Sequence, residues 1–316
     1  MEEAFRLIAV MLREYAGWVG ICYRVDFDPT GAKQFALTLY VDVEALQPWL
    51  GQFEITATAI LRLAGFQAAF KLESIGRMIP AGGIAASGIS TGTNVGKAHE
   101  GVVSFFARVD GDDWMVTANH VISGNGAYVP PLAPGNLDSA VVWVGPGQKV
   151  IGRRVTSKKI VKGQQPPPTI DAAACIVTGS LGATLYPGFP SYSPVAYPKK
   201  DVTPDAKFFC RNDRTPVTVA PHDGNEFLVS YTPFIGMGLG DDIQFQNQWL
   251  VRADQAFQPG DSGSLIVGRH QGTLKPLGML FAMEEQNDSH YALVTPIQDI
   301  VAGLWPGKKP SEITLL

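Results

Sequence analysis

The chain has 316 residues, of which 46% are hydrophobic and 17% are charged, and its formal net charge at pH 7 is −4. This length suggests about two domains of ~150 residues each. A weakly acidic chain presents no basic footprint, so we expect no nucleic-acid partner. No stretch reaches the roughly 20 apolar residues that span a membrane, and the acidic opening MEEAFRLI is unlike a signal peptide. The sequence therefore predicts a soluble, cytoplasmic protein without a membrane partner.

The first 75 residues carry the pattern of a small α/β region. The predicted elements are a helix at 2–15, strands at 19–27 and 34–43, a short helix at 44–50, and strands at 53–63 and 66–72. This region holds no catalytic constellation of its own. Its predicted role is packing or docking, with an inhibitory prosegment as the alternative.

Residues 76–100 differ in composition from what precedes them. Runs such as IPAGG and SGISTGT are typical of a linker or an extended arm. A nucleotide-binding loop would need the pattern G-x-x-x-x-G-K-[ST] between a strand and a helix, and the chain lacks it.

From residue 101 onward the sequence predicts a mostly β structure, rich in the glycine and proline that turns require. A hairpin is predicted from strands at 102–109 and 114–121 around the turn DGDD. Further strands are predicted at 141–144, 149–152, 171–177, 207–210, 216–220, 227–231 and 249–253.

The most informative stretch is QPGDSGSL, residues 258–265. A serine between glycines can hold its hydroxyl clear of neighbours, and such a turn can aim two N–H groups at one point. We therefore predict Ser262 as a nucleophile and the N–H groups of Gly260 and Ser262 as an oxyanion hole. The alternative is a β-turn with a passive serine.

Two further residues could complete a catalytic row. His120 is the one histidine of five that lies beside apolar residues at the end of a strong strand, and it is a candidate general base. Asp171 begins an apolar strand, where a carboxylate needs a hydrogen-bond partner such as an imidazole N–H. Asp138 is the rival for that role, and a buried structural histidine is the alternative for His120.

These motifs, TANH at 117–120, IDAA at 170–173 and GDSGS at 260–264, resemble those of the chymotrypsin-like serine endopeptidases, most closely the bacterial trypsin-like members. The resemblance covers roughly residues 101–305. It implies a His120–Asp171–Ser262 triad and two six-stranded antiparallel β-barrels with a C-terminal helix. Asn119 and Ser264 depart from the commonest pattern. The partner of Asp261, which in animal zymogens pairs with a new N-terminus, stays open.

The resemblance also sets the expected boundaries. Residues 1–75 form the N-terminal region, 76–100 the linker, and 101–316 the protease domain, with barrel 1 at about 101–178 and barrel 2 at about 180–305. In the C-terminal helix, an apolar face is predicted on Ile297, Ile300, Val301 and Leu304.

The family's substrate pocket is carried onto four residues, with Ala256 at its base and Phe281, Ala282 and Met283 along one wall. Because Ala256 carries no charge, we expect a small or apolar residue before the cleaved bond. Glu284 and Glu285 could instead attract a basic side chain.

The predicted partner is a protein or peptide substrate. A catalytically idle protease fold used for binding is one alternative function. Another is a narrow processing enzyme that cuts its own chain, in which case the cut is expected within residues 76–101.

The three cysteines, Cys22, Cys175 and Cys210, form an odd set without metal-site spacing, and no cofactor or metal is expected. Cys22 and Cys175 lie in apolar runs and are predicted to be buried. Free thiols fit a reducing compartment.

Overall fold

The structure is a computed structural model. It describes residues 2–27, 33–66, 70–80, 89–91, 100–101, 103–123, 141–143, 150–157, 169–178, 207–209, 217–221, 227–231, 243–270, 273–285 and 290–315.

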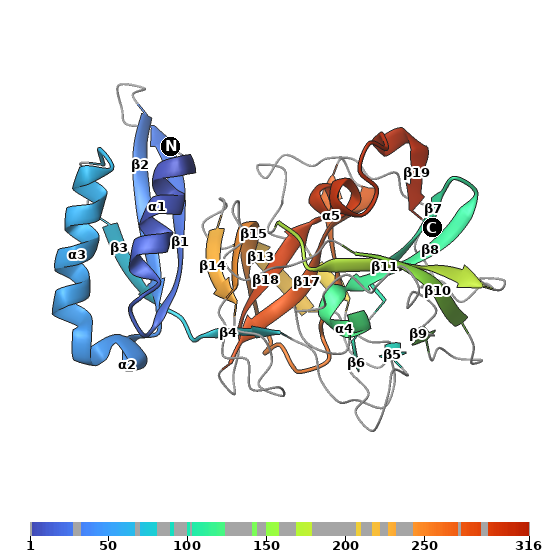
Figure 1. The fold of residues 1–316 in the computed structure, drawn as a ribbon, viewed down its shortest axis with the longest axis horizontal. Helices are drawn as coiled ribbons and strands as arrows, with labels where there is room; N and C mark the ends of the chain where they lie inside the picture. The colour runs from blue at the N-terminus through green and yellow to red at the C-terminus, as the bar shows by residue number, and fades with distance from the viewer. Residues whose placement is uncertain are drawn as a thin grey trace.

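The N-terminal region has an α/β fold, seen at one end of the molecule in Figure 1. Its elements are α1 (Glu2–Leu12), β1 (Trp18–Phe27), β2 (Lys33–Val41), α2 (Val43–Leu46), η1 (Gln47–Trp49), α3 (Leu50–Leu63) and β3 (Phe70–Ser74). Strand β1 pairs antiparallel with β2, and β2 pairs parallel with β3.

The strand predicted at 53–63 is wrong, because these residues belong to helix α3. The buried residues of α3 are Phe53, Ala57, Ile60 and Leu61, which recur at helical spacing, while Ile55 is 69% exposed. The β-branched residues of this segment favoured a strand locally. Packing of one helical face against the sheet overrides that preference.

Both faces of the N-terminal sheet are buried. On one face Ile21, Leu37 and Leu39 pack in a cluster with residues of α1 and α3. On the other face Val19 and Tyr40 belong to the main core of the molecule. Strand β1 also pairs antiparallel with β14 (Phe227–Tyr231), so the N-terminal sheet continues into the sheet that carries the nucleophile.

The remaining elements are mostly strands. They are β4 (Met78–Pro80), β5 (Ile89–Thr91), β6 (Glu100–Gly101), β7 (Phe105–Val109), β8 (Asp112–Ala118), α4 (Asn119–Ser123), β9 (Val141–Trp143), β10 (Val150–Ser157), β11 (Ala172–Thr178), β12 (Lys207–Phe209), β13 (Val217–Pro221), β15 (Ile243–Ala253), β16 (Leu265–His270), β17 (Thr273–Glu284), β18 (Tyr291–Pro296), α5 (Ile297–Leu304), η3 (Pro310–Glu312) and β19 (Ile313–Leu315). The prediction of a mostly β protein is confirmed.

The strands form two sheets. The 11-stranded sheet has the order β13-β12-β16-β17-β18-β15-β14-β1-β2-β3, with β4 attached to β17. Because β13 also pairs with β15, six of these strands close into a ring. The 8-stranded sheet has the order β19-β7-β8-β11-β10-β9-β5-β6, and the pairings among its described residues form an open path. A second six-stranded barrel is therefore not established by the described strands.

The C-terminal helix α5 buries Ile297, Ile300, Val301 and Leu304, which confirms the predicted apolar face. After α5 the chain returns to the 8-stranded sheet, where β19 pairs with β7 along its edge. Among the described helices none is long and apolar enough to cross a membrane.

Candidate active site

His120 lies in the short helix α4, directly after strand β8. The β8–β11 register sets Ala118 opposite Ala172, so the residues that follow β8 meet the residues that precede β11. The backbone closes this junction with a hydrogen bond from the Asn119 N–H to the Asp171 carbonyl, at 3.2 Å. The pairing of two strands therefore brings His120 and Asp171 together.

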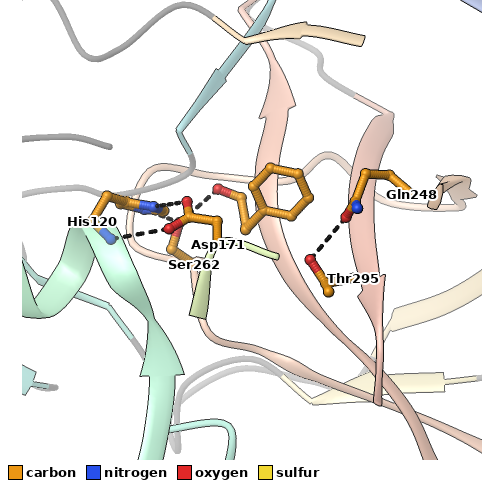
Figure 2. Close-up of polar contacts among 6 residues, drawn as sticks. His120, Asp171, Gln248, Ser262 and Thr295 are labelled. Atoms are coloured by element: carbon orange, nitrogen blue, oxygen red, sulfur yellow. Dashed lines mark hydrogen bonds and ion pairs between the residues drawn. The ribbon is translucent and has the colours of Figure 1, made fainter. Parts of the chain in front are cut away.

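The Asp171 carboxylate is fully buried and contacts His120 at two points (Figure 2). Its Oδ2 lies 2.6 Å from Nδ1 of the imidazole, and its Oδ1 accepts from the His120 backbone N–H at 3.2 Å. The N–H contact fixes the carboxylate, and the carboxylate in turn orients the ring. With Nδ1 protonated toward Asp171, Nε2 is the acceptor on the other side of the ring.

Ser262 lies on that other side. Its Oγ is 2.7 Å from His120 Nε2 and 3.1 Å from the carbonyl oxygen of Phe281. Carboxylate, imidazole and hydroxyl thus form one hydrogen-bonded row, drawn from the residue before β11, from α4 and from the loop before β16 (Figure 2). Ser262 is 0% exposed and His120 is 4% exposed, so the row is closed to solvent.

The loop around Ser262 is bent at two glycines with positive φ, Gly260 at 99° and Gly263 at 94°. A residue with a Cβ would be strained at either position. The N–H groups of Asp261, Gly263 and Ser264 donate to the carbonyls of Gln258, Leu280 and Asp261 respectively.

The N–H groups of Gly260 and Ser262 have no acceptor within the described ranges. They are the two donors predicted for an oxyanion hole, and the bend at Gly260 leaves both available.

Asp261 is buried and braces this loop. Its Oδ2 accepts from the backbone N–H of Gln258 at 2.8 Å. The carboxylate therefore holds the turn that precedes the nucleophile, in addition to other contacts that Asp261 makes.

Of the four predicted pocket residues, Phe281 contacts the nucleophile, through its carbonyl oxygen. Phe281, Ala282 and Met283 follow one another on β17 and are buried, whereas Ala256 is partly exposed. Phe281 packs on Phe245 in the main core with a ring distance of 5.0 Å, and Met283 belongs to the smaller cluster that includes Phe257. Whether these side chains line a substrate pocket stays a prediction.

Glu284, at the end of β17, is buried and accepts a hydrogen bond from the backbone N–H of Gly76. Burial raises the pKa of its carboxyl, while the bond from Gly76 and the nearby His290 lower it by less. Glu285 is exposed, and its backbone N–H donates to the carbonyl of Arg77 at 2.7 Å.

Gln248 was missed by the sequence analysis. This buried residue of β15 donates from Nε2 to the carbonyl of Thr169 at 2.8 Å and to that of Gln246 at 2.6 Å, and its Oε1 accepts from Thr295 at 2.8 Å. It ties β15 and β18 to the segment that leads into Asp171. Figure 2 shows its contact with Thr295. Because Gln248 directly follows the polar residues Gln246 and Asn247, no local pattern indicates that its side chain is buried.

The structure describes only some of the other histidine, aspartate and cysteine residues. His290 places Nδ1 3.0 Å from the carbonyl of Ala253. Asp138, the rival for Asp171, lies outside the described residues. Cys22 and Cys175 are buried, as predicted for both, and neither forms a disulfide, while Cys210 also lies outside the described residues. Within the described ranges no group of His, Cys, Asp and Glu is arranged to hold a metal ion.

Comparisons with family models and with curated proteins gave no match. Among solved structures, the chain is similar to a glutamic acid-specific serine protease that uses a histidine triad in substrate binding. The match has 17% identity and a TM-score of 0.38, and it covers 75% of this chain and 100% of that one. A likeness at this level does not establish a family for this chain.

The chemistry that the site can perform follows from its own geometry. A hydroxyl that donates to an imidazole can lose its proton as it attacks an electrophile. A buried carboxylate on the far nitrogen stabilises the imidazolium that forms. Such a row suits acyl transfer.

Proposed function

We propose that this protein is a serine endopeptidase of the chymotrypsin-like fold, which hydrolyses peptide bonds of a protein or peptide substrate through an acyl-enzyme. The observation that carries this proposal is the row Asp171–His120–Ser262, with contacts of 2.6 Å and 2.7 Å. Three residues far apart in the sequence meet in the order and spacing that the reaction needs.

In the proposed reaction, Ser262 Oγ attacks the carbonyl carbon of the substrate while His120 Nε2 takes the hydroxyl proton. The carbonyl becomes an oxyanion, held by the N–H groups of Gly260 and Ser262. The C–N bond then breaks as His120 returns the proton to the leaving amine. A water molecule, deprotonated by His120, hydrolyses the acyl-enzyme, and the proton returns to Ser262. Asp171 keeps Nδ1 protonated throughout.

The proposed architecture is the two-barrel one. The closed ring of β12, β13 and β15–β18 would be the barrel that supplies Ser262, and the sheet with β8 and β11 would be the barrel that supplies His120 and Asp171. The division into residues 1–75, 76–100 and 101–316 belongs to the same proposal. Cytoplasmic location does too, and it is supported by the lack of a disulfide at Cys22 and Cys175.

For specificity we propose a small or apolar residue before the cleaved bond. Ala256 offers no charge, and the burial of Glu284 against Gly76 keeps that carboxylate from a basic substrate side chain. A peptide-library cleavage profile tests this point, and a profile dominated by Lys and Arg would overturn it.

The decisive experiment is labelling with a fluorophosphonate probe, followed by peptide mapping. The expected result is modification of Ser262, together with peptide hydrolysis that Ser262→Ala lowers by ~10⁴–10⁶-fold. Full hydrolysis in a folded Ser262→Ala variant would rule out the proposal. Labelling also separates an active enzyme from an idle protease fold.

Self-processing is the second candidate, and it is favoured by the pairing of β4 with β17 beside the nucleophile loop. Mass spectrometry of the purified chain tests it. A fragment cut within residues 76–101, absent from the Ser262→Ala variant, would support self-processing, and an intact wild-type chain after long incubation would argue against it.

A further inference from the structure

Strand β17 has one edge along which three segments follow one another. Strand β16 pairs with it as far as Met279, opposite Leu265. The nucleophile loop comes next, with Gly263 and Ser264 bonded to the backbone of Leu280. Ser262 Oγ then contacts the carbonyl of Phe281.

Strand β4 takes the next places on this edge. Pro80 pairs with Ala282, Ile79 with Met283 and Met78 with Glu284. The opposite edge of β17 is already paired with β18, through Ala282–Leu293 and Met283–Ala292. Since a strand has two edges, β4 and the nucleophile loop must share one.

The direction of β4 relative to the nucleophile is set by its antiparallel register. As the chain runs from Met78 to Pro80, its partners run from Glu284 back to Ala282, toward Phe281 and Ser262. A peptide that pairs in this direction brings its C-terminal end to the nucleophile. Its paired residues are those that precede a cleaved bond.

The sequence of β4 suits this place. In an antiparallel ladder, pairs joined by backbone hydrogen bonds alternate with pairs that are not. Proline has no N–H, so Pro80 fits a pair without these bonds, opposite Ala282. The neighbouring pair, Ile79 and Met283, is then the hydrogen-bonded one. The half-buried Ile79 packs against the apolar cluster that contains Met283 and Phe257. The edge therefore receives an aliphatic residue followed by a proline.

Two backbone contacts hold the N-terminal approach to β4. The Gly76 N–H donates to the buried Glu284 carboxylate, and the Arg77 carbonyl accepts from the Glu285 N–H at 2.7 Å. Met78 is 0% exposed within the main core. These contacts fasten β4 beside a nucleophile that is itself closed to solvent.

We propose that β4 occupies, within its own chain, the strand edge that binds the substrate residues preceding the cleaved bond. Strand β4 is then an intramolecular competitor of substrate. Its sequence indicates the preferred peptide class, an aliphatic residue followed by a proline. This inference rests on the proposed peptidase function for its meaning, although β4 occupancy can be measured without catalysis.

The test is peptide binding to a chain that cannot cleave. Acetyl-Met-Ile-Pro-Ala-amide, whose four residues copy 78–81, is titrated calorimetrically into the Ser262→Ala variant and into the double variant Ser262→Ala with Ile79→Asp. The added carboxylate opposes packing of residue 79 on the apolar cluster and releases β4. If β4 covers the edge in about nine molecules of ten, release lowers the apparent Kd about tenfold.

Three controls sharpen this measurement. Ile55→Asp places the same change at an exposed site of α3 and should leave the Kd unchanged. Acetyl-Met-Pro-Ile-Ala-amide, with its two central residues exchanged, should bind more weakly than the parent peptide. Ile79→Thr, a milder change, should lower the Kd in the same direction if Ile79→Asp does not fold.

Equal Kd values with and without the residue-79 substitutions would overturn the inference, even if the wild-type protein hydrolyses peptides. A lower Kd after release of β4, in a chain whose wild type is neither labelled at Ser262 nor active, would support the occupancy and reject the peptidase function. The two failures are therefore distinguishable.

Discussion

Gln248 donates a hydrogen bond of 2.8 Å to the carbonyl of Thr169, which lies two residues before Asp171. The same side chain accepts from Thr295, so one buried amide joins β15 and β18 to the approach to the carboxylate. This bond links the sheet that carries the Ser262 loop to the segment that carries Asp171.

Replacing Gln248 should therefore displace Asp171 without touching substrate. We expect Gln248→Leu to lower kcat by about 10- to 100-fold with little change in KM, because misplaced catalytic groups act on the chemical step. The unpaired Thr169 carbonyl and Thr295 hydroxyl should also lower the free energy of unfolding by ~1–3 kcal/mol. Gln298→Leu, at an exposed site of α5, is the matched control. A wild-type kcat in Gln248→Leu would exclude the positioning role.

Asp171→Asn keeps the size of the side chain and removes its charge. The amide can donate to His120 Nδ1, which favours the tautomer with the proton on Nε2 and leaves no acceptor for Ser262. We expect kcat to fall about 10⁴-fold while the fold stays intact. Peptide hydrolysis and far-UV circular dichroism measure the two properties. Asp112→Asn, an exposed change at the start of β8, should behave as wild type.

The thiol of Cys175 should be unreactive in the native protein. Burial raises the pKa of its thiol to about 12, so the reactive thiolate is scarce at neutral pH. We expect iodoacetamide to spare Cys175 in the native state and to alkylate it after unfolding in urea, as followed by peptide mass spectrometry. Alkylation of Cys175 in the native state would show that β11 opens far more readily than its burial implies.

Glu284 should make stability depend on pH. Burial raises the pKa of this carboxyl above its ordinary 4.5, so the folded state holds its proton to a higher pH than the unfolded state does. The protonated Glu284 therefore adds to the free energy of unfolding. This added stability is complete below pH 4.5 and is lost as pH rises through the pKa of the folded state.

Urea unfolding across this pH window measures the effect. Glu284→Gln keeps an acceptor for the Gly76 N–H but cannot titrate, so its free energy of unfolding should fall less with rising pH than that of the wild type. The same substitution at the exposed neighbour Glu285 is the control. If the free energies of unfolding of wild type and Glu284→Gln changed with pH in parallel, Glu284 would not be the source of the pH dependence.

Local sequence was sufficient for features that depend on spacing along the chain. The buried face of α5 follows from apolar residues at helical intervals, and the bend at Gly260 follows from the Gly-Asp-Ser-Gly motif. The candidates His120, Asp171 and Ser262 could also be named from their neighbours, because each chemistry requires a particular residue type in a particular local setting. The helix at 50–63 was misjudged because its β-branched residues favour a strand until a tertiary surface selects one helical face.

Only the tertiary structure decided which distant segments meet. The register of β8 on β11 brings His120 to Asp171, and the edge of β17 sets the Ser262 loop beside β4. Gln248 gains its bond to Thr169 in the same way. Strand pairing between remote segments leaves no periodic trace in either segment, since the backbone groups that pair are the same in every residue. The sequence determined which side chains could react, and the packing of the sheets determined which of them meet.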